Sequence, residues 1–201
     1  MKIALLPIVI AANVAAVFSA PVLAQGLPAD CSKAAVPAQP LEISILGTKF
    51  APKSVKLRFA GAMTSGDDQY DAYHLTFRNE DDIFAPLEAE VAVIVRKGQS
   101  VDGKTFRKLP VKESSKQPSP NPGGQPEVQG WSVKNRDAKT DQSHVTYIAS
   151  LRLEFGKRQG DSIGGKIYLC VPKGQTTLFD KTPSPAESSA VGTFTAKIDK
   201  N

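Results

Sequence analysis

The chain has 201 residues, of which 41% are hydrophobic and 22% charged, with a formal net charge of +5. A chain of this length can bury a core without bound metals or many disulfides, so its composition calls for no metal and no cofactor. The basic residues are interspersed with acidic ones, as in residues 134–139, which is typical of a solvated surface. We therefore expect no nucleic-acid partner.

The first 24 residues have the features of a cleavable signal peptide. Met1 and Lys2 give a positive start, an almost wholly apolar run follows, and residues 22–24 supply the small residues of a cleavage site. The run of about 16 apolar residues is shorter than the roughly 20 needed to span a bilayer. We predict cleavage after Ala24, no membrane insertion of the mature chain, and a location in the periplasm or outside the cell. A lipid anchor on Cys31 is disfavoured because Asp30 precedes it.

The chain has two cysteines, Cys31 and Cys170. An even pair in an exported protein predicts a disulfide bond. This bond would tie an extended N-terminal segment, residues 25–40, to a strand near the other end of the chain. A reactive thiol is disfavoured because neither a C-x-x-C spacing nor a neighbouring histidine is present.

From residue 41 onward, apolar and polar residues alternate with a period of two, which predicts β-strands rather than helices. The stretch from Asp82 to Glu90 is interpreted as a loop, and Ser114–Pro126, with four prolines, as a long solvated loop. In chain order, the predicted strands cover residues 41–45, 55–59, 73–77, 91–95, 145–155, 165–171 and 191–198, with a further alternating segment at 128–134.

About eight or nine such strands without helices predict an all-β fold for residues 41–201, an antiparallel two-sheet β-sandwich. Jelly-roll and immunoglobulin-like arrangements fit equally well. The loop at 114–126 could instead link two small domains. We favour a single domain because the predicted disulfide joins the two halves of the chain.

One acidic segment combines an aromatic ring with carboxylates: Asp67, Asp68, Tyr70 and Asp71. It lacks the spacing of an EF-hand loop, so we expect no metal there. Tyr70 is the best candidate for an exposed aromatic residue, and a ring beside carboxylates is typical of sugar-binding sites. These four residues are the predicted ligand-binding site.

The two histidines, His74 and His144, are interpreted as surface residues, and no G-x-S-x-G motif is present. We therefore predict a non-catalytic binding or structural module of the cell envelope or extracellular space. Its expected ligand is a polysaccharide or a surface protein. Two alternatives stay open: a small secreted glycan hydrolase, and an assembly subunit that adds or accepts an edge strand.

Overall fold

The computed structural model describes residues 27–28, 30–108, 127–136, 144–147, 149–176 and 183–199. Within these ranges the structure is all-β, which confirms the predicted class. None of the described segments is a helix that could cross a membrane. The predicted signal peptide and the proline-rich loop at 114–126 lie outside the described residues.

The described residues form eleven strands rather than the eight or nine expected. Four of them have only three or four residues, and two of these, at residues 48–50 and 105–108, are too short to show a period of two. The predicted long strand at 145–155 is two strands, because the chain leaves one part of the sheet after residue 147 and enters another at residue 150. The strands are β1 (Glu42–Ile45), β2 (Thr48–Phe50), β3 (Ser54–Ser65), β4 (Asp68–Arg78), β5 (Leu87–Arg96), β6 (Thr105–Lys108), β7 (Glu127–Asn135), β8 (His144–Tyr147), β9 (Ser150–Gln159), β10 (Ser162–Val171) and β11 (Ser188–Asp199).

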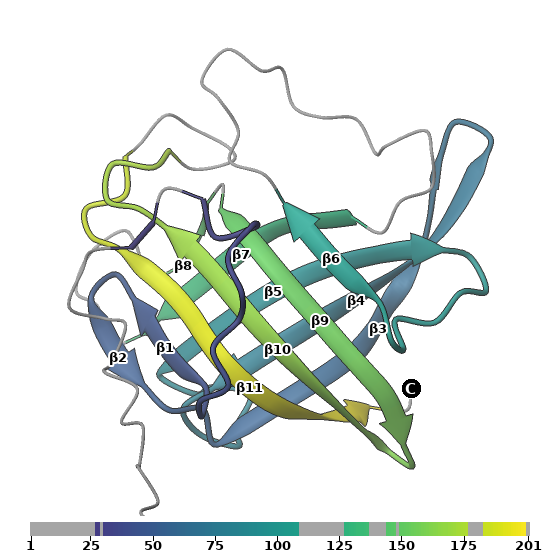
Figure 1. Ribbon diagram of the computed structural model, residues 1–201, viewed down its shortest axis with the longest axis horizontal. Helices are drawn as coiled ribbons and strands as arrows, with labels where there is room; N and C mark the ends of the chain where they lie inside the picture. Colours follow the sequence, from purple (N-terminus) through teal and green to yellow (C-terminus); the bar gives the residue numbers. More distant parts are fainter. Residues whose placement is uncertain are drawn as a thin grey trace, which may run out of the picture.

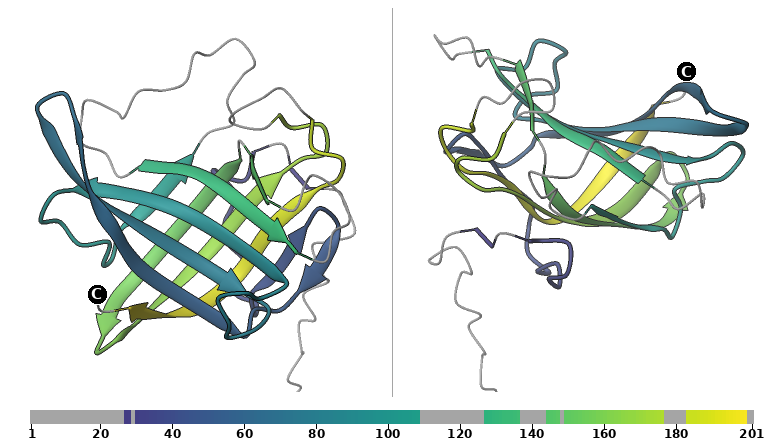
Figure 2. Two further views of the ribbon diagram at one scale, coloured as in Figure 1. Left: turned by 180° about the vertical axis from the view of Figure 1, so that it is seen from behind. Right: turned by 90° about the horizontal axis from the view of Figure 1, so that it is seen from above.

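All eleven strands belong to one hydrogen-bonded sheet, which is not closed. Its order is β6-β9-β10-β11-β3-β4-β5-β7-β8, with β1 paired to β11 and β2 paired to β1. The sheet folds over itself, so that β9, β10 and β11 cross in front of β3, β4 and β5 (Figures 1 and 2). A short parallel ladder between β11 and β3 joins the two layers. The predicted division into two separate sheets is therefore not confirmed.

The main core lies between the two layers and contains a chain of edge-to-face aromatic rings. Phe77 contacts Phe194, Phe194 contacts Phe155, and Phe155 contacts Phe106, with centroid separations of 5.7, 6.0 and 5.8 Å. Gly165 lies in register between Phe155 and Phe194. A Cβ atom there would lie 2.8 Å from the carbonyl oxygen of Glu154, so the close approach of strands and rings requires glycine.

A second, smaller core lies on the outer face of β10 and β11, under residues 27–28 and 30–40, which we call the N-terminal strap. The predicted disulfide between Cys31 and Cys170 is confirmed, with a Cα–Cα distance of 5.8 Å. Both cysteines are fully buried, together with Tyr168 and Val191. In Figure 1 the strap crosses in front of β10 and β11. A buried disulfide indicates an oxidising environment.

The strap lies against β11 at Gly192 and Thr193. The neighbouring Thr193 donates from its backbone N–H and its hydroxyl to the carbonyl oxygen of Gln39, at 2.8 and 3.1 Å. Gly192 has a φ of 132°, and a Cβ atom there would lie 2.6 Å from the carbonyl oxygen of Pro40. Glycine therefore permits both the backbone conformation and the contact.

Candidate functional site

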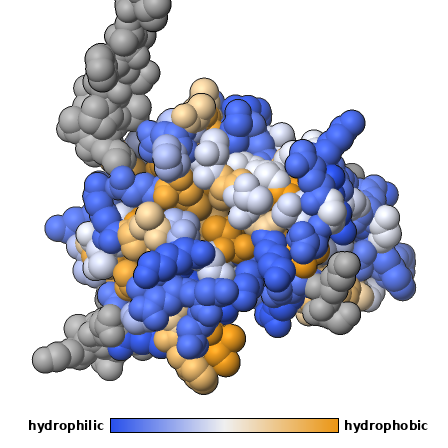
Figure 3. Space-filling model, turned by 90° about the horizontal axis from the view of Figure 1, so that it is seen from below, coloured by the Kyte–Doolittle hydropathy of each residue, from blue (hydrophilic) through white to orange (hydrophobic). Residues whose placement is uncertain are grey.

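The connection between β4 and β5, which we call the 79–86 loop, displays the two most exposed large apolar side chains of the described residues. Ile83 is 65% and Phe84 73% exposed, whereas Phe59 is 36% exposed. The loop lies at the lower edge of the molecule in Figure 1, and the view from below shows apolar surface among hydrophilic residues (Figure 3). Neighbouring exposed apolar side chains on one loop make this loop a candidate contact surface, because contiguous apolar surface marks interaction sites.

Asn, Asp and Pro in residues 79–86 favour a turn, and β5 begins at Leu87. The sequence interpretation of Asp82–Glu90 as a loop is therefore correct for Asp82–Pro86 and wrong for Leu87–Glu90. The physical reason is that the period-two alternation of β5 already begins at Leu87, whose side chain is buried.

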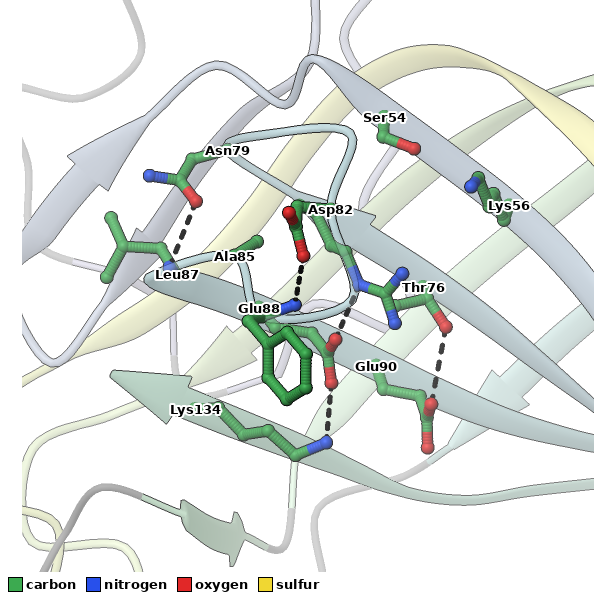
Figure 4. Close-up of polar contacts among 12 residues, drawn as sticks. Ser54, Lys56, Thr76, Asn79, Asp82, Ala85, Leu87, Glu88, Glu90 and Lys134 are labelled. Carbon is green, nitrogen blue, oxygen red and sulfur yellow. Dashed lines mark hydrogen bonds and ion pairs between the residues drawn. The ribbon is translucent and has the colours of Figure 1, made fainter. Parts of the chain in front are cut away.

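Hydrogen bonds close the loop at its base and near its tip. The N–H of Asn79 donates to the carbonyl of Leu87 at 3.1 Å, and the N–H of Leu87 donates to Oδ1 of Asn79 at 3.0 Å (Figure 4). Near the tip, Asp82 Oδ1 accepts from the N–H of Phe84 at 2.7 Å. Local side-chain-to-backbone bonds of this type stabilise a turn without help from a sheet.

Residues of β3, and Arg136 immediately after β7, hold the loop from two sides. On one side, Asp81 accepts a hydrogen bond from Ser54 at 2.9 Å and pairs with the Lys56 ammonium at 3.0 Å. These contacts lower the pKa of Asp81. On the other side, Arg136 donates to the carbonyls of Pro86 and Ala85, at 2.8 and 2.6 Å, and its guanidinium lies 5.8 Å from the ring centre of Phe84.

A buried carboxylate lies at the start of β5, on the outer face of β4, β5 and β7, opposite to the core residues Leu87 and Ala89. Glu88 is 3% exposed and opposes Arg78 on β4 and Lys134 on β7 in the strand register. Arg78 Nε and Lys134 Nζ each lie 2.6 Å from a Glu88 oxygen (Figure 4). Burial alone would raise the pKa of Glu88, but the hydrogen bonds from Lys134 and Arg78 outweigh it, so the pKa is lowered.

The next position along the face forms a second polar group. Glu90 accepts a hydrogen bond from Thr76 at 3.2 Å, and its other oxygen lies 3.0 Å from Nδ1 of His74. His74, expected at the surface, is half-buried. The side chain of His144, the first residue of β8, lies outside the described part of the structure.

The structure does not gather the four predicted ligand-binding residues into one site, although Asp68 and Tyr70 are hydrogen-bonded to each other. Tyr70 is only 6% exposed, so the expectation of an exposed aromatic ring is wrong. The turn contains only Gly66 and Asp67, and Tyr70 lies inside β4, where it pairs with Met63 and Arg96.

The three aspartates do not converge on a common point. Asp67 is exposed in the turn, and Asp68 accepts a 3.3 Å hydrogen bond from Tyr70. Asp71 lies three residues after Asp68 on β4, so its side chain faces the other side of the strand. It accepts a hydrogen bond from the N–H of Gly98 at 2.9 Å. Among the described residues, no group of three His, Cys, Asp or Glu side chains could hold a metal ion.

An open depression of about 310 Å³ lies over β9 and β10. Gly156 and Gly164 leave it open because they lack side chains, and Glu154 and Lys166 line it. The Glu154 carboxylate already pairs with Arg152 Nε at 2.6 Å. The depression therefore exists because Gly156 and Gly164 have no side chains to fill it. Its lining includes one carboxylate, Glu154, which is already paired with Arg152.

Comparisons of this chain with protein-family models, with curated proteins and with solved structures find no match. The candidate site therefore rests on the residues themselves. The sequence did carry a signal for it: two large apolar residues, Ile83 and Phe84, interrupt a run of turn-forming and acidic residues. What the sequence could not show is that the loop is held in place.

Proposed function

We propose that the mature protein is a non-catalytic binding module of an extracytoplasmic compartment, and that it binds another protein through the 79–86 loop. The observation that carries the proposal is the combination of exposure and restraint. Ile83 and Phe84 are exposed, while backbone or side-chain atoms of the flanking loop residues are hydrogen-bonded at the base, at the tip and on both sides.

This combination favours binding on energetic grounds. Association loses affinity when a loop must be ordered, and a loop that is already ordered avoids that cost. A few buried anchor residues, with aromatic residues prominent among them, carry most of the binding free energy in protein interfaces. An aromatic residue with a guanidinium on one face and solvent on the other is suited to this role.

The compartment is proposed on two grounds. The disulfide between Cys31 and Cys170 indicates oxidising conditions, and the first 24 residues have the pattern of a signal peptide. The periplasm and the extracellular space meet both conditions.

A protein ligand is favoured over the other candidates. The polysaccharide hypothesis depended on an exposed Tyr70, which is buried. A glycan hydrolase needs two carboxylates across a cleft, and the depression over β9 and β10 is lined by Glu154. An edge-strand subunit is less supported because β6 and β8, the two ends of the sheet path, have four residues each in the described part of the chain, and short edges discourage strand addition.

Photo-crosslinking in the native cell envelope tests the proposal. A photoreactive phenylalanine analogue is placed at position 84, and at the exposed position Lys157 on β9 as the matched control. We expect a discrete protein adduct from position 84 and none of that size from position 157. Absence of any protein adduct from position 84, or the same adducts from both positions, would contradict the proposal.

A further inference from the structure

We infer that the surface recognised by the 79–86 loop is a protein pocket that is apolar at its centre and bordered by basic side chains. This inference rests on the proposed function and adds the chemistry of the partner. It follows from the charges that surround Ile83 and Phe84.

The 79–86 loop has a charge opposite in sign to the net charge of the whole molecule. The whole chain carries +5, yet three consecutive acidic residues, Glu80, Asp81 and Asp82, precede Ile83. Asp81 is paired with Lys56 within the molecule. Glu80 and Asp82 are exposed, and neither has an ion-pair partner in the described part of the chain. Two carboxylates without an ion-pair partner among the described residues therefore border the apolar tip, where the Arg136 guanidinium is the one cation described over the Phe84 ring.

The tip itself is oriented by Arg136. Its guanidinium lies over the Phe84 ring and is hydrogen-bonded to the carbonyl of Ala85. The ring is nevertheless 73% exposed, so a partner can cover it together with Ile83. Apolar side chains enter a pocket at the centre of such an interface, and charged groups lie at its rim, where they select the partner.

The same charges disfavour a lipid surface. Loops that insert apolar residues into membranes are assisted by cationic side chains, because biological membranes carry anionic headgroups. Glu80 and Asp82 would instead bring carboxylates against those headgroups. Basic groups around a protein pocket, by contrast, would complement them.

The test uses the photo-adduct from position 84 in a chain that also carries Glu80→Gln and Asp82→Asn. Asparagine keeps the oxygen that accepts the N–H of residue 84, so the turn is retained. The control chain carries Asp67→Asn and Asp161→Asn, two exposed turn residues elsewhere, and has the same net charge. We expect the adduct yield at limiting partner to fall about three- to tenfold in the first chain and to stay unchanged in the control.

Each other outcome overturns the inference in a distinguishable way. An adduct of unchanged or higher yield after the Glu80 and Asp82 substitutions leaves the proposed function intact but contradicts basic groups at the rim. Absence of any adduct from position 84 in the chain that keeps Glu80 and Asp82 contradicts both the proposed function and this inference. Co-flotation of the purified mature protein with vesicles of phosphatidylcholine and phosphatidylglycerol, abolished by Phe84→Ser, would show that a lipid surface is the occupant.

Discussion

At the scale of single residues, Glu88 shows how the outer face of the sheet is stabilised. A buried carboxylate is costly unless it is paired and hydrogen-bonded. Here the strand register places Arg78 and Lys134 on either side of Glu88. The pairing matters for the candidate site because Glu88 lies two residues after Pro86, at the end of the loop.

The lowered pKa of Glu88 predicts how stability depends on pH. An unfolded chain has a glutamate pKa of about 4.3, so between the two pKa values the unfolded state binds more protons and stability rises with pH. The contribution is complete above about pH 5 and is lost as the pH falls through the folded pKa. We expect Glu88→Gln to lower the free energy of unfolding by about 1–3 kcal/mol at pH 7, and by less at pH 3.

Urea denaturation of both proteins between pH 3 and pH 7 measures this difference. Asp81 and Asp30, whose pKa values are also lowered, are present in both proteins and cancel in the comparison. A difference in unfolding free energy between the wild-type protein and Glu88→Gln that stays constant over the whole pH range would show that the charge of Glu88 has no role.

Two adjacent glycines give a sharper test of the core. A Cβ atom at Gly165 would lie 2.9 Å from Cε2 of Phe194, whereas at Gly164 the nearest contact would be 3.9 Å. We expect Gly165→Ala to lower the free energy of unfolding by about 1–3 kcal/mol through overpacking. Gly164→Ala, the control, should change it by less than about 0.5 kcal/mol. Equal effects in thermal or urea unfolding would refute the aromatic packing described for Phe155 and Phe194.

At the scale of elements, the N-terminal strap depends on its covalent link. The segment has no strand of its own and covers Tyr168 and Val191 on the outer face of β10 and β11. The disulfide closes a sequence separation of 139 residues. In the chain-entropy description, long loops of this kind give the largest stabilisation.

Replacing both cysteines by serine is therefore expected to cost about 2–5 kcal/mol of unfolding free energy. Urea unfolding of the double variant, beside the oxidised wild-type protein, measures the loss. Reduced wild-type protein serves as a control that alters no side-chain volume. A double variant as stable as the oxidised protein would show that the strap is held by its apolar contacts alone.

The elements also show how far sequence patterns reach. Alternation identified β5, β9, β10 and β11 because apolar core residues recur at every second position of each strand, although parts of β5, β10 and β11 are buried on both faces. It missed β2 and β6, which have three and four residues, and it merged β8 with β9 into one predicted strand. It also placed Tyr70 in a loop, because a turn of two residues, Gly66 and Asp67, is shorter than the acidic segment suggests.

At the scale of the whole molecule, the class and the disulfide could be predicted, but the topology could not. The parallel ladder between Lys197–Asp199 and Lys56–Arg58 joins the two layers into one sheet. Such a pairing is between residues far apart in the chain and leaves no local pattern. The same limit applies to the candidate site, since Ser54, Lys56 and Arg136 reach the 79–86 loop from distant parts of the sequence.

The central claim is that the 79–86 loop is ordered before it meets a partner. Backbone ¹⁵N relaxation of the free, oxidised mature protein tests it most directly. We predict order parameters of about 0.85 for Ile83, Phe84 and Ala85, equal to those of β4 and β5. Values below about 0.6 at these three residues would show a flexible loop and contradict the account.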